Sequence, residues 1–504
     1  MTYLEMPTHI QAFYKADTYP HATNTIEMIQ THASWVFLSG DFAYKFKKPV
    51  DFGFMDFSTL AKRKYYCEQE LTLNRKLSPD IYLAVLPVYQ FGETFNLSGL
   101  GKVADYCVKM FQFDQSDLLD KKMEHDELDP QWMDQLAENV ARFHAQAAIN
   151  TDSTFDHASL LAEHLQDNLA IAVRYSQQAI DSTQLQTLLN FKNSQLATHQ
   201  KPLKQRQSEL HIRHCHGDLH FRNITLLHGK PTLFDCIEFN AEYSIIDCMN
   251  DIAFLVMDCD AHARPDLGMR FLSRYLEYCG DYAGLTLLPL YLFYRATVRG
   301  KVACILAEEL ANERIGEQQQ AQWFEARSYF NLASTYTKQQ QPTLFAIGGL
   351  SGSGKSHLSL LGCGKERAII IRSDATRQRI SADYPDLELY SRAMHINTYK
   401  AMFDAARTVL QAGYSVILDA TFLHPDSRQQ AYQLACECGA ELHFLWLDIE
   451  TDRLKENICN RQQAGHDISD ADLSVLALQL TEYQRPDEIF IRFLSSNEQW
   501  PSNL

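Results

Sequence analysis

The sequence predicts two domains of different fold class, an α+β domain followed by an α/β domain with a doubly wound parallel sheet. In the first part, strand-like runs come before a long region of helical periodicity. From residue 343 onward, short apolar runs alternate with helical stretches, as expected when helices cover both faces of a parallel sheet. A length of 504 residues leaves room for two or three domains, each with its own core.

Composition restricts the partners. The hydrophobic content of 46% and the charged content of 22% are ordinary for a globular protein. The formal net charge of −17 disfavours nucleic acid as a general partner, although it is compatible with a small basic pocket. No apolar run approaches the length that spans a bilayer, and no basic-then-apolar leader begins the chain, so we expect a cytoplasmic protein without a membrane partner. The twelve cysteines lack recurring CxxC pairs, which indicates reduced thiols rather than a zinc ribbon or disulfide scaffold.

The first domain is expected to begin with a helical lead-in over residues 1–31. Residues 34–38 and 42–47 then predict two antiparallel strands joined by a tight turn. Alternation along the second strand places Lys45 and Lys47 on the same face. By itself, a lysine on a strand face is more often a solvated charge than a binding residue.

The next helix changes this interpretation. We expect it to run from a cap at Ser58 to about Leu77. One face of it would carry Tyr66, Glu70, Leu73 and Leu77. Because an unpaired carboxylate on an apolar face is costly, Glu70 requires a cationic partner. Lys45 is the preferred partner, and Lys47 is the alternative because it shares the strand face.

A second polar pattern occupies residues 214–223. His216, Asp218 and Asn223 reproduce the spacing H-x-D-L-x-x-x-N, the catalytic loop of kinases. About a dozen residues later, a strand at 232–234 leads into Asp235. Asp218 can accept the proton of an attacking hydroxyl, or orient that hydroxyl. Asn223 and Asp235 would then supply oxygen ligands to Mg²⁺ on the nucleotide phosphates.

A histidine-rich metal site is the rival interpretation of the same loop. Its ligands would be His214, His216, Asp218 and His220, which alternate along the chain. That interpretation leaves Asn223, Asp235, Lys45 and Glu70 without a role. A purely structural polar turn is weaker still, because four correlated features occur in the right order.

Together, residues 42–45, Glu70, residues 216–223 and Asp235 resemble the aminoglycoside/choline phosphotransferase branch of the protein-kinase fold. The H-G-D-x-H-x-x-N spelling is characteristic of that branch. The resemblance implies an N-lobe over about 32–112 and a C-lobe over about 113–338, with Lys45 on the nucleotide phosphates and a hinge near Met110 that binds adenine. The chain lacks both the G-x-G-x-x-G loop and the glycine of D-F-G, which suggests a site without the activation switch of protein kinases.

Two arginines in the later helical region allow two explanations. Arg295 and Arg299 share one face of an otherwise apolar stretch. Salt bridges within the domain are the simpler explanation, and contact with an anionic substrate or with the second domain is the alternative. Residues 338–342, polar with a proline, form the clearest linker, so we place the domains at 1–338 and 343–504.

The second domain opens with a phosphate-binding loop. Residues 349–356 match G-x-x-x-x-G-K-[ST] directly after an apolar strand at 343–347. In such loops, backbone N–H groups and a helix N-terminus point at phosphate oxygens. The predicted nucleotide-binding residues are Gly349, Ser351, Gly352, Ser353, Gly354, Lys355 and Ser356. Lys355 would reach the β- and γ-phosphates, and the Ser356 hydroxyl would ligate Mg²⁺.

Two more strands end in aspartates. The runs 368–371 and 415–418 lead to Asp374 and Asp419, which should meet the loop at the carboxyl edge of the sheet. This half resembles the P-loop kinases related to phage polynucleotide kinase and to the zeta-toxin and gluconate-kinase groups. The resemblance implies that Asp374 deprotonates the acceptor, that Arg377 orients it and that Asp419 lies on the metal side. It also implies a lid arginine at Arg461, before residues 469–471.

The order of the two resemblances matches a bacterial class of fused proteins. We therefore predict a bifunctional phosphotransferase with two sites, dependent on ATP and Mg²⁺, which acts on hydroxyl groups of small sugar-like or nucleoside-like molecules. One alternative is a kinase of 5′-hydroxyl nucleic-acid ends. The other is a regulatory ATP-binding protein in which only one domain is catalytically competent.

Overall fold

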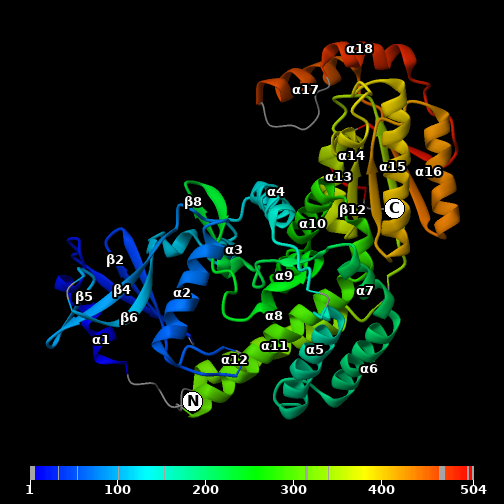
Figure 1. Cartoon of the computed structure of the whole chain (residues 1–504). Helices are drawn as coiled ribbons and strands as arrows, with labels where there is room; N and C mark the ends of the chain where they lie inside the picture. Colours follow the sequence, from blue (N-terminus) through cyan, green and yellow to red (C-terminus); the bar gives the residue numbers. More distant parts are fainter. Residues whose placement is uncertain are drawn as a thin grey trace.

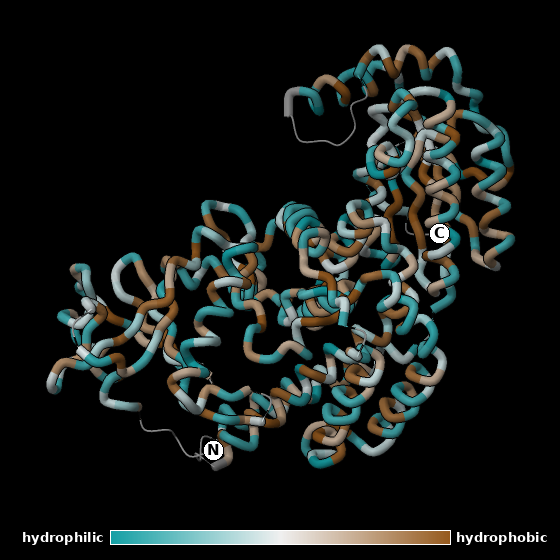
Figure 2. Tube along the Cα trace, viewed as in Figure 1, coloured by the Kyte–Doolittle hydropathy of each residue, from teal (hydrophilic) through white to brown (hydrophobic). Residues whose placement is uncertain are grey.

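The computed structural model describes residues 6–31, 33–53, 55–99, 101–152, 154–312, 316–338, 340–464, 472–495 and 499–501. Figure 1 shows an N-terminal sheet in blue, a helical region in cyan and green, and a second sheet with its helices in yellow to red. Along the tube of Figure 2, hydrophobic colouring gathers on the strands of that second sheet. Within the described ranges, no helix is both long and apolar enough to cross a membrane.

The N-terminal sheet has six antiparallel strands in the order β1-β2-β3-β6-β4-β5. Their bounds are β1 Ile26–Gln30, β2 Ser34–Ser39, β3 Phe42–Lys47, β4 Tyr82–Phe91, β5 Thr94–Asn96 and β6 Lys102–Phe111. Alternation along β3 works as predicted: Tyr44 and Phe46 enter one apolar cluster, and Ala43 enters another on the opposite face. The second cluster includes Cys67 of helix α2, Leu60–Asn74, which covers that face.

Two expectations for this region are wrong. The lead-in is not helical throughout, because β1 adds an edge strand to the sheet, and within residues 6–31 the short α1, Thr8–Gln11, is the only α-helix. Helix α2 is capped by the hydroxyl of Thr59, which accepts from the N–H of Lys62, rather than by Ser58. It ends at Asn74, short of Leu77, so the expected helix boundaries were too wide at both ends.

The middle of the chain is helical and carries two small two-stranded antiparallel sheets. Its helices are α3 Leu119–Glu124, α4 Pro130–Gln146, α5 His157–Arg174, α6 Ser182–Thr198, α7 Gln200–Ser208, α8 Ala241–Ser244, α9 Cys248–Ala261, α10 Pro265–Cys279, α11 Leu288–Asn312 and α12 Gly316–Thr335. One sheet pairs β7 Ile212–His214 with β10 Ile245–Asp247, and the other is a hairpin of β8 Ile224–Leu227 and β9 Lys230–Leu233. The loop 215–223 lies between β7 and β8, and α9 is buried along almost its whole length.

The second sheet is parallel, with strand order β12-β13-β11-β14-β15. Its strands are β11 Thr343–Gly349, β12 Ile369–Arg372, β13 Val416–Asp419, β14 Glu441–Leu447 and β15 Ile491–Leu494. The helices are α13 Lys355–Glu366, α14 Ser373–Ile380, α15 Arg392–Gln411, α16 Pro425–Cys438, α17 Thr451–Ala464 and α18 Leu473–Glu482. Sequence periodicity predicts the first four strands and misses β15, a short edge strand with two exposed residues in its middle.

Candidate active sites

The loop between β7 and β8 is held in place by α9. The backbone N–H groups of His216 and Gly217 donate to the two carboxylate oxygens of the fully buried Asp251, at 3.0 and 2.8 Å. Gly217 has φ +84°, and a Cβ there would lie 2.7 Å from the carbonyl oxygen of Tyr243. Only glycine fits at this position without a shift of the backbone.

Within this loop, Asp218 and Asn223 are in direct contact. The side-chain amide of Asn223 donates to the Asp218 carboxylate at 2.8 Å and to its backbone carbonyl at 2.9 Å. The ring of His220 lies 3.2 Å from the same carboxylate. Burial raises the pKa of Asp218. The neighbouring His220 and His216 lower the pKa by more than burial raises it, so the net pKa is below its usual range. Asp218 is therefore ionised at neutral pH, and such a carboxylate orients a hydroxyl better than it removes the proton outright.

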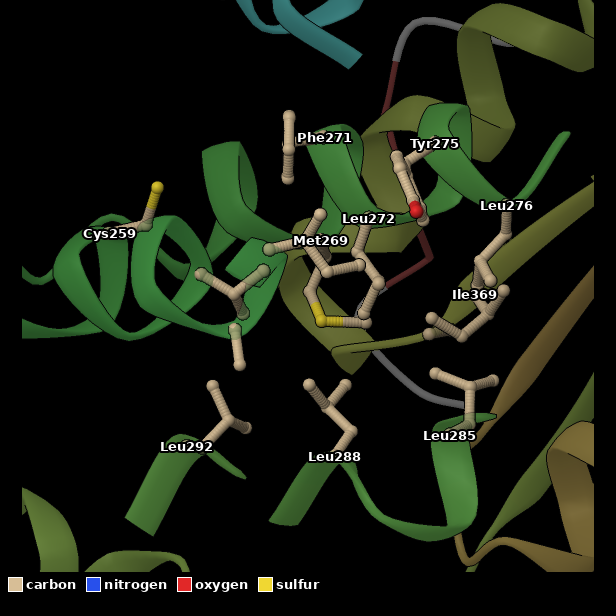
Figure 3. Close-up of a cluster of buried hydrophobic side chains, with 14 of the residues drawn as sticks. Cys259, Met269, Phe271, Leu272, Tyr275, Leu276, Leu285, Leu288, Leu292 and Ile369 are labelled. Atoms are coloured by element: carbon tan, nitrogen blue, oxygen red, sulfur yellow. The ribbon is translucent and has the colours of Figure 1, made fainter. Parts of the chain in front are cut away.

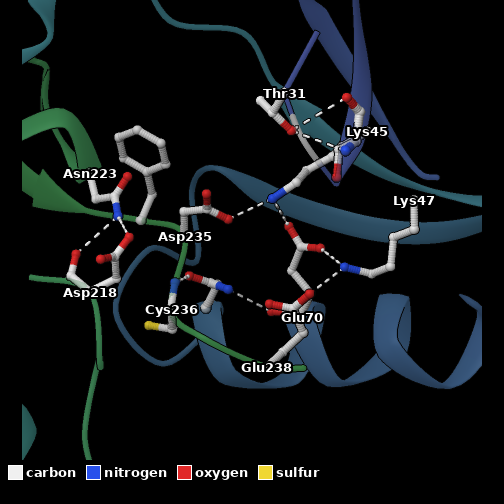
Figure 4. Close-up of polar contacts among 12 residues, drawn as sticks. Thr31, Lys45, Lys47, Glu70, Asp218, Asn223, Asp235, Cys236 and Glu238 are labelled. Carbon is white, nitrogen blue, oxygen red and sulfur yellow. Dashed lines mark hydrogen bonds and ion pairs between the residues drawn. The ribbon is translucent and has the colours of Figure 1, made fainter. Parts of the chain in front are cut away.

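Asp235 lies between this pair and the N-terminal sheet (Figure 4). It adopts a left-handed backbone conformation with φ +63°, which aspartate tolerates better than most residues. The ammonium group of Lys45 lies 2.5 Å from its carboxylate and 2.9 Å from that of Glu70. Burial lowers the pKa of Lys45, but Asp235 and Glu70 outweigh it and hold the pKa well above its usual value. The strand lysine, the helix glutamate and the distant aspartate thus form one charge cluster.

The sequence left open whether Lys45 or Lys47 pairs with Glu70. In the structure both lysines contact it. Lys47 lies 2.7 Å from the other oxygen of Glu70 and also pairs with Glu238. Its side chain is 1% exposed, whereas that of Lys45 is 15% exposed. Lys45 is therefore the lysine that a ligand can reach. Sequence reasoning missed Glu238, which neutralises Lys47 from 191 residues away.

The expected hinge lies at the end of β6. Met110 pairs with Ala43 on one side and Tyr82 on the other. The next N–H groups, of Phe111 and Gln112, donate to carbonyls of Ile81 and Asp41 within the protein. The adenine-binding role of Met110 stays a prediction.

The rival histidine cluster does not assemble. His216 is bonded through its ring to the carbonyl of Phe234 at 2.9 Å, and His220 contacts Asp218. Among the residues that the structure describes, the set with converging metal-ligand atoms is instead His144, Cys215 and Cys248, all buried. Both ring nitrogens of His144 already have partners there, the Tyr275 hydroxyl and the Asp251 carboxylate.

Arg295 and Arg299 make contacts within the first domain. The Arg295 guanidinium donates to the side chain of Asn250 and to the carbonyl of Gly217, both at 2.9 Å. Arg299 donates to Glu325 at 3.3 Å. The ion pair of Arg299 is the kind of contact that the simpler explanation expects. Arg295 forms hydrogen bonds rather than a salt bridge, and through them it supports the loop 215–223 from inside.

The phosphate-binding loop joins β11 to α13 as predicted from its motif. Gly349 and Gly352 have φ +145° and +84°, and a Cβ on Gly352 would lie 2.5 Å from the carbonyl oxygen of Leu454. The Lys355 ammonium donates to the carbonyls of Gly349 and Leu350 at 3.0 Å each. Burial lowers the pKa of Lys355, while Asp419 and Asp374 oppose that shift. The lysine lies at the junction of the loop and the two strand-end aspartates.

A cavity of about 1870 Å³ opens over this loop. It is lined by every second-domain site residue predicted from sequence except Gly349: Ser351, Gly352, Ser353, Gly354, Lys355, Ser356, Asp374, Arg377, Asp419 and Arg461. Arg377 donates to Asp374 at 2.9 Å across one turn of α14. The lid segment 469–471 lies outside the described residues. This volume exceeds the roughly 300–1,000 Å³ of a typical single-ligand pocket.

Two residues of the last helices hold the loop and were not predicted. The side chain of Gln479 accepts from the N–H of Ser351 at 2.8 Å and donates to its hydroxyl at 2.9 Å. Asn457 donates to the carbonyl of Gly352 at 2.8 Å. A lone glutamine on an amphipathic helix carries no sequence signal for such a contact.

Comparisons with known proteins agree with both halves. Residues 64–288 match the family model described as phosphotransferase enzyme family, and residues 344–486 match the one described as AAA domain. An uncharacterized protein of Mycobacterium tuberculosis and one of Mycobacterium bovis are each 28% identical to this chain over 467 residues, 91% of its length and 91% of theirs. These matches confirm the predicted resemblance and the two predicted fold classes.

Several solved structures are similar to part of the chain. A choline/ethanolamine kinase family protein from Mesorhizobium loti is 11% identical, with a TM-score of 0.37, over 66% of this chain and 99% of its own. The Mycobacterium tuberculosis APS kinase CysC, in complex with AMPPNP and APS, is 20% identical with a TM-score of 0.25, over 31% and 89%. A gluconokinase from Sinorhizobium meliloti is 17% identical with a TM-score of 0.24, over 31% and 84%.

Proposed function

We propose that this phosphotransferase, which joins a domain of the phosphotransferase enzyme family to a P-loop kinase domain, transfers the γ-phosphate of ATP to hydroxyl groups at two separate sites. The observation that carries the proposal is the presence of two independent groupings of lysine, aspartate and oxygen ligands, around Lys45 and around Lys355. We assign residues 1–338 to the first domain and 343–504 to the second.

In the first site, we assign Lys45 to the nucleotide phosphates, oriented by Glu70. Asp218 would accept a hydrogen bond from the acceptor hydroxyl and orient its oxygen toward the γ-phosphate. Because the amide nitrogen of Asn223 is bonded to Asp218, its oxygen is the atom suited to a cation, and the half-exposed Asp235 carboxylate adds another. These donors fit Mg²⁺, which when bound neutralises charge on the phosphates.

In the second site, the loop N–H groups and Lys355 would bind the phosphates, with Ser356 and Asp419 as the oxygen ligands that suit Mg²⁺. Asp374 would take the acceptor proton, and its contact with Arg377 would fix both side chains. Arg461 lines the same cavity and would neutralise charge on the phosphoryl group in transfer.

The acceptors we propose are small, polar, hydroxylated molecules, in a cytoplasmic setting. The test is ATP-dependent mass gain across a panel of hydroxylated metabolites and 5′-hydroxyl oligonucleotides. Phosphorylation of a metabolite supports the proposal, and phosphorylation of oligonucleotides alone would replace it with an end-kinase function. The proposal would be contradicted if no acceptor were phosphorylated in a reaction that depends on Lys355 or on Asp218.

A further inference from the structure

Helix α10 belongs to the fold of the first domain, yet it packs directly on the second. Leu276 lies beside Ile369 of β12 in a shared apolar cluster (Figure 3). The hydroxyl of Ser273 accepts from the backbone N–H of Ile370 at 3.0 Å. The contact is close enough that a Cβ on Gly364 of α13 would lie 2.4 Å from the Cβ of Asp266. The edge strand of the parallel sheet is therefore covered by a helix of the other domain.

At the end of this contact, Glu277 of α10 binds Arg372 of β12. Two guanidinium nitrogens donate to the two carboxylate oxygens at 2.6 Å each, and both residues are buried. Arg274 donates to the same carboxylate at 2.9 Å. Arg372 is the last residue of β12, directly precedes Ser373 and Asp374, and lines the nucleotide cavity.

The geometry of this pair matters because both charges are buried. A bidentate arginine–carboxylate contact fixes the plane of the guanidinium, which a single hydrogen bond would not do. Removing one partner leaves an uncompensated buried charge and is strongly unfavourable. Without Glu277, the Arg372 side chain would turn toward the cavity or its strand end would move. The first change would place a new charge in the cavity that Asp374 also lines, and the second would displace Asp374, two residues later.

We propose that Glu277 is a positioning residue for the second phosphoryl-transfer site, supplied by the first domain. It holds Arg372 against the interdomain contact and thereby sets the strand end that carries Asp374. The P-loop site is thus completed by α10, and it works only in the joined protein. This inference rests on the proposed function of the second site.

The chain offers a matched control for the test. Asp260, at the end of α9, binds Arg367 in the second domain with the same bidentate geometry, at 2.9 Å for each bond. Arg367 does not line the nucleotide cavity. Asp260→Asn therefore breaks an interdomain pair of the same bidentate geometry, with a more exposed arginine, outside the lining of the cavity.

The experiment compares Glu277→Gln with Asp260→Asn in the full-length protein carrying Asp218→Asn, so that only the second site turns over. ATP turnover should fall by at least about tenfold in Glu277→Gln, while the Kd for an ATP analogue changes by less than about threefold. Hydrogen exchange of the peptide spanning 373–380 should rise only in Glu277→Gln. Equal turnover and equal exchange in the two variants would overturn the inference.

Two further arms keep the outcomes separate. If Glu277→Gln folds poorly, the double variant Glu277→Gln/Arg372→Gln removes both charges of the pair. We expect this double variant to have a normal melting temperature and low turnover. Wild-type turnover in the double variant would overturn the inference. Lys355→Ala in the Asp218→Asn background shows whether the second site turns over ATP at all. If it does not, the proposed function fails there, and the hydrogen-exchange comparison still decides whether Glu277 orders the strand end.

Discussion

Glu70 of α2 places one carboxylate oxygen 2.9 Å from Lys45 and the other 2.7 Å from Lys47, so a single buried acid serves two strand lysines. Burying these charges is tolerable here because each lysine has a second carboxylate partner from the segment after the catalytic loop, Asp235 for Lys45 and Glu238 for Lys47. The N-terminal sheet and the catalytic-loop region are thereby joined by ion pairs at the candidate site.

Replacing Lys45 should separate catalysis from stability. In a Lys355→Ala background, Lys45→Met is expected to lower turnover at the first site about 100-fold, because a phosphate-binding charge is lost. Lys47→Met, at the fully buried neighbour, should chiefly lower the melting temperature, since Glu238 loses its partner. Steady-state kinetics and thermal unfolding of both variants check this. Equal loss of turnover with unchanged melting in both would count against the assignment of Lys45.

The stability of the protein should depend on the ionisation of Glu70. Burial raises its pKa, but Lys45 and Lys47 outweigh burial and lower the pKa from 4.5 to about 2. The unfolded state then binds the proton more tightly, so this stabilisation is complete above pH 4.5 and is lost as the pH falls toward 2. Urea unfolding between about pH 3 and pH 6 should show a flatter pH dependence in Glu70→Gln. The exposed Glu68→Gln should keep the wild-type slope.

Gly217 offers a test of the catalytic-loop geometry. Gly217→Ala should destabilise the protein by about 3 kcal/mol and reduce first-site turnover, because its Cβ would collide with the carbonyl of Tyr243. Gly229 has a similar φ of +74°, and no atom lies within 4 Å of the position that a Cβ would take there, so Gly229→Ala should cost only about 1 kcal/mol. Chemical denaturation measures both. Identical losses would show that backbone conformation alone, and not the contact, sets the requirement for glycine.

Gln479 should influence nucleotide binding from a helix remote in sequence. Removing its two bonds to Ser351 frees the phosphate-binding loop, so Gln479→Ala is expected to weaken binding of an ATP analogue at the second site about tenfold. Thr481→Ala, an exposed position on the same helix, is the control. Calorimetry in a Lys45→Met background isolates the second site. Unchanged affinity in Gln479→Ala would show that the loop holds its shape without α18.

The features of the fold and the sites that the sequence predicts are those whose residues lie close together along the chain. The loop 349–356 needs its glycines and lysine within a few residues, and the H-G-D-x-H-x-x-N run brings Asp218 and Asn223 together in one turn. Glu70 was predictable because a carboxylate on an apolar helix face requires a partner. Four strands of the parallel sheet stand out as buried apolar runs.

The missed features depend on long-range contacts. Glu238 reaches Lys47, Gln479 reaches Ser351, and Glu277 reaches Arg372 across 95 residues or more, with no periodicity to mark the pairing. The edge strands β1 and β15 were missed because each contains at least two exposed residues, so neither forms a continuous buried apolar run. Pairing with a neighbouring strand, and not local propensity, makes these segments strands.

The central claim is that one polypeptide carries two phosphoryl-transfer sites that work separately. The most direct measurement is acceptor-dependent ATP consumption by Asp218→Asn, by Lys355→Ala and by the double variant, each as the full-length protein. We expect residual turnover in each single variant, with different acceptors phosphorylated in each, and no turnover in the double variant. Complete loss of turnover in one single variant, with full turnover in the other, would contradict it and leave a protein with one catalytic domain.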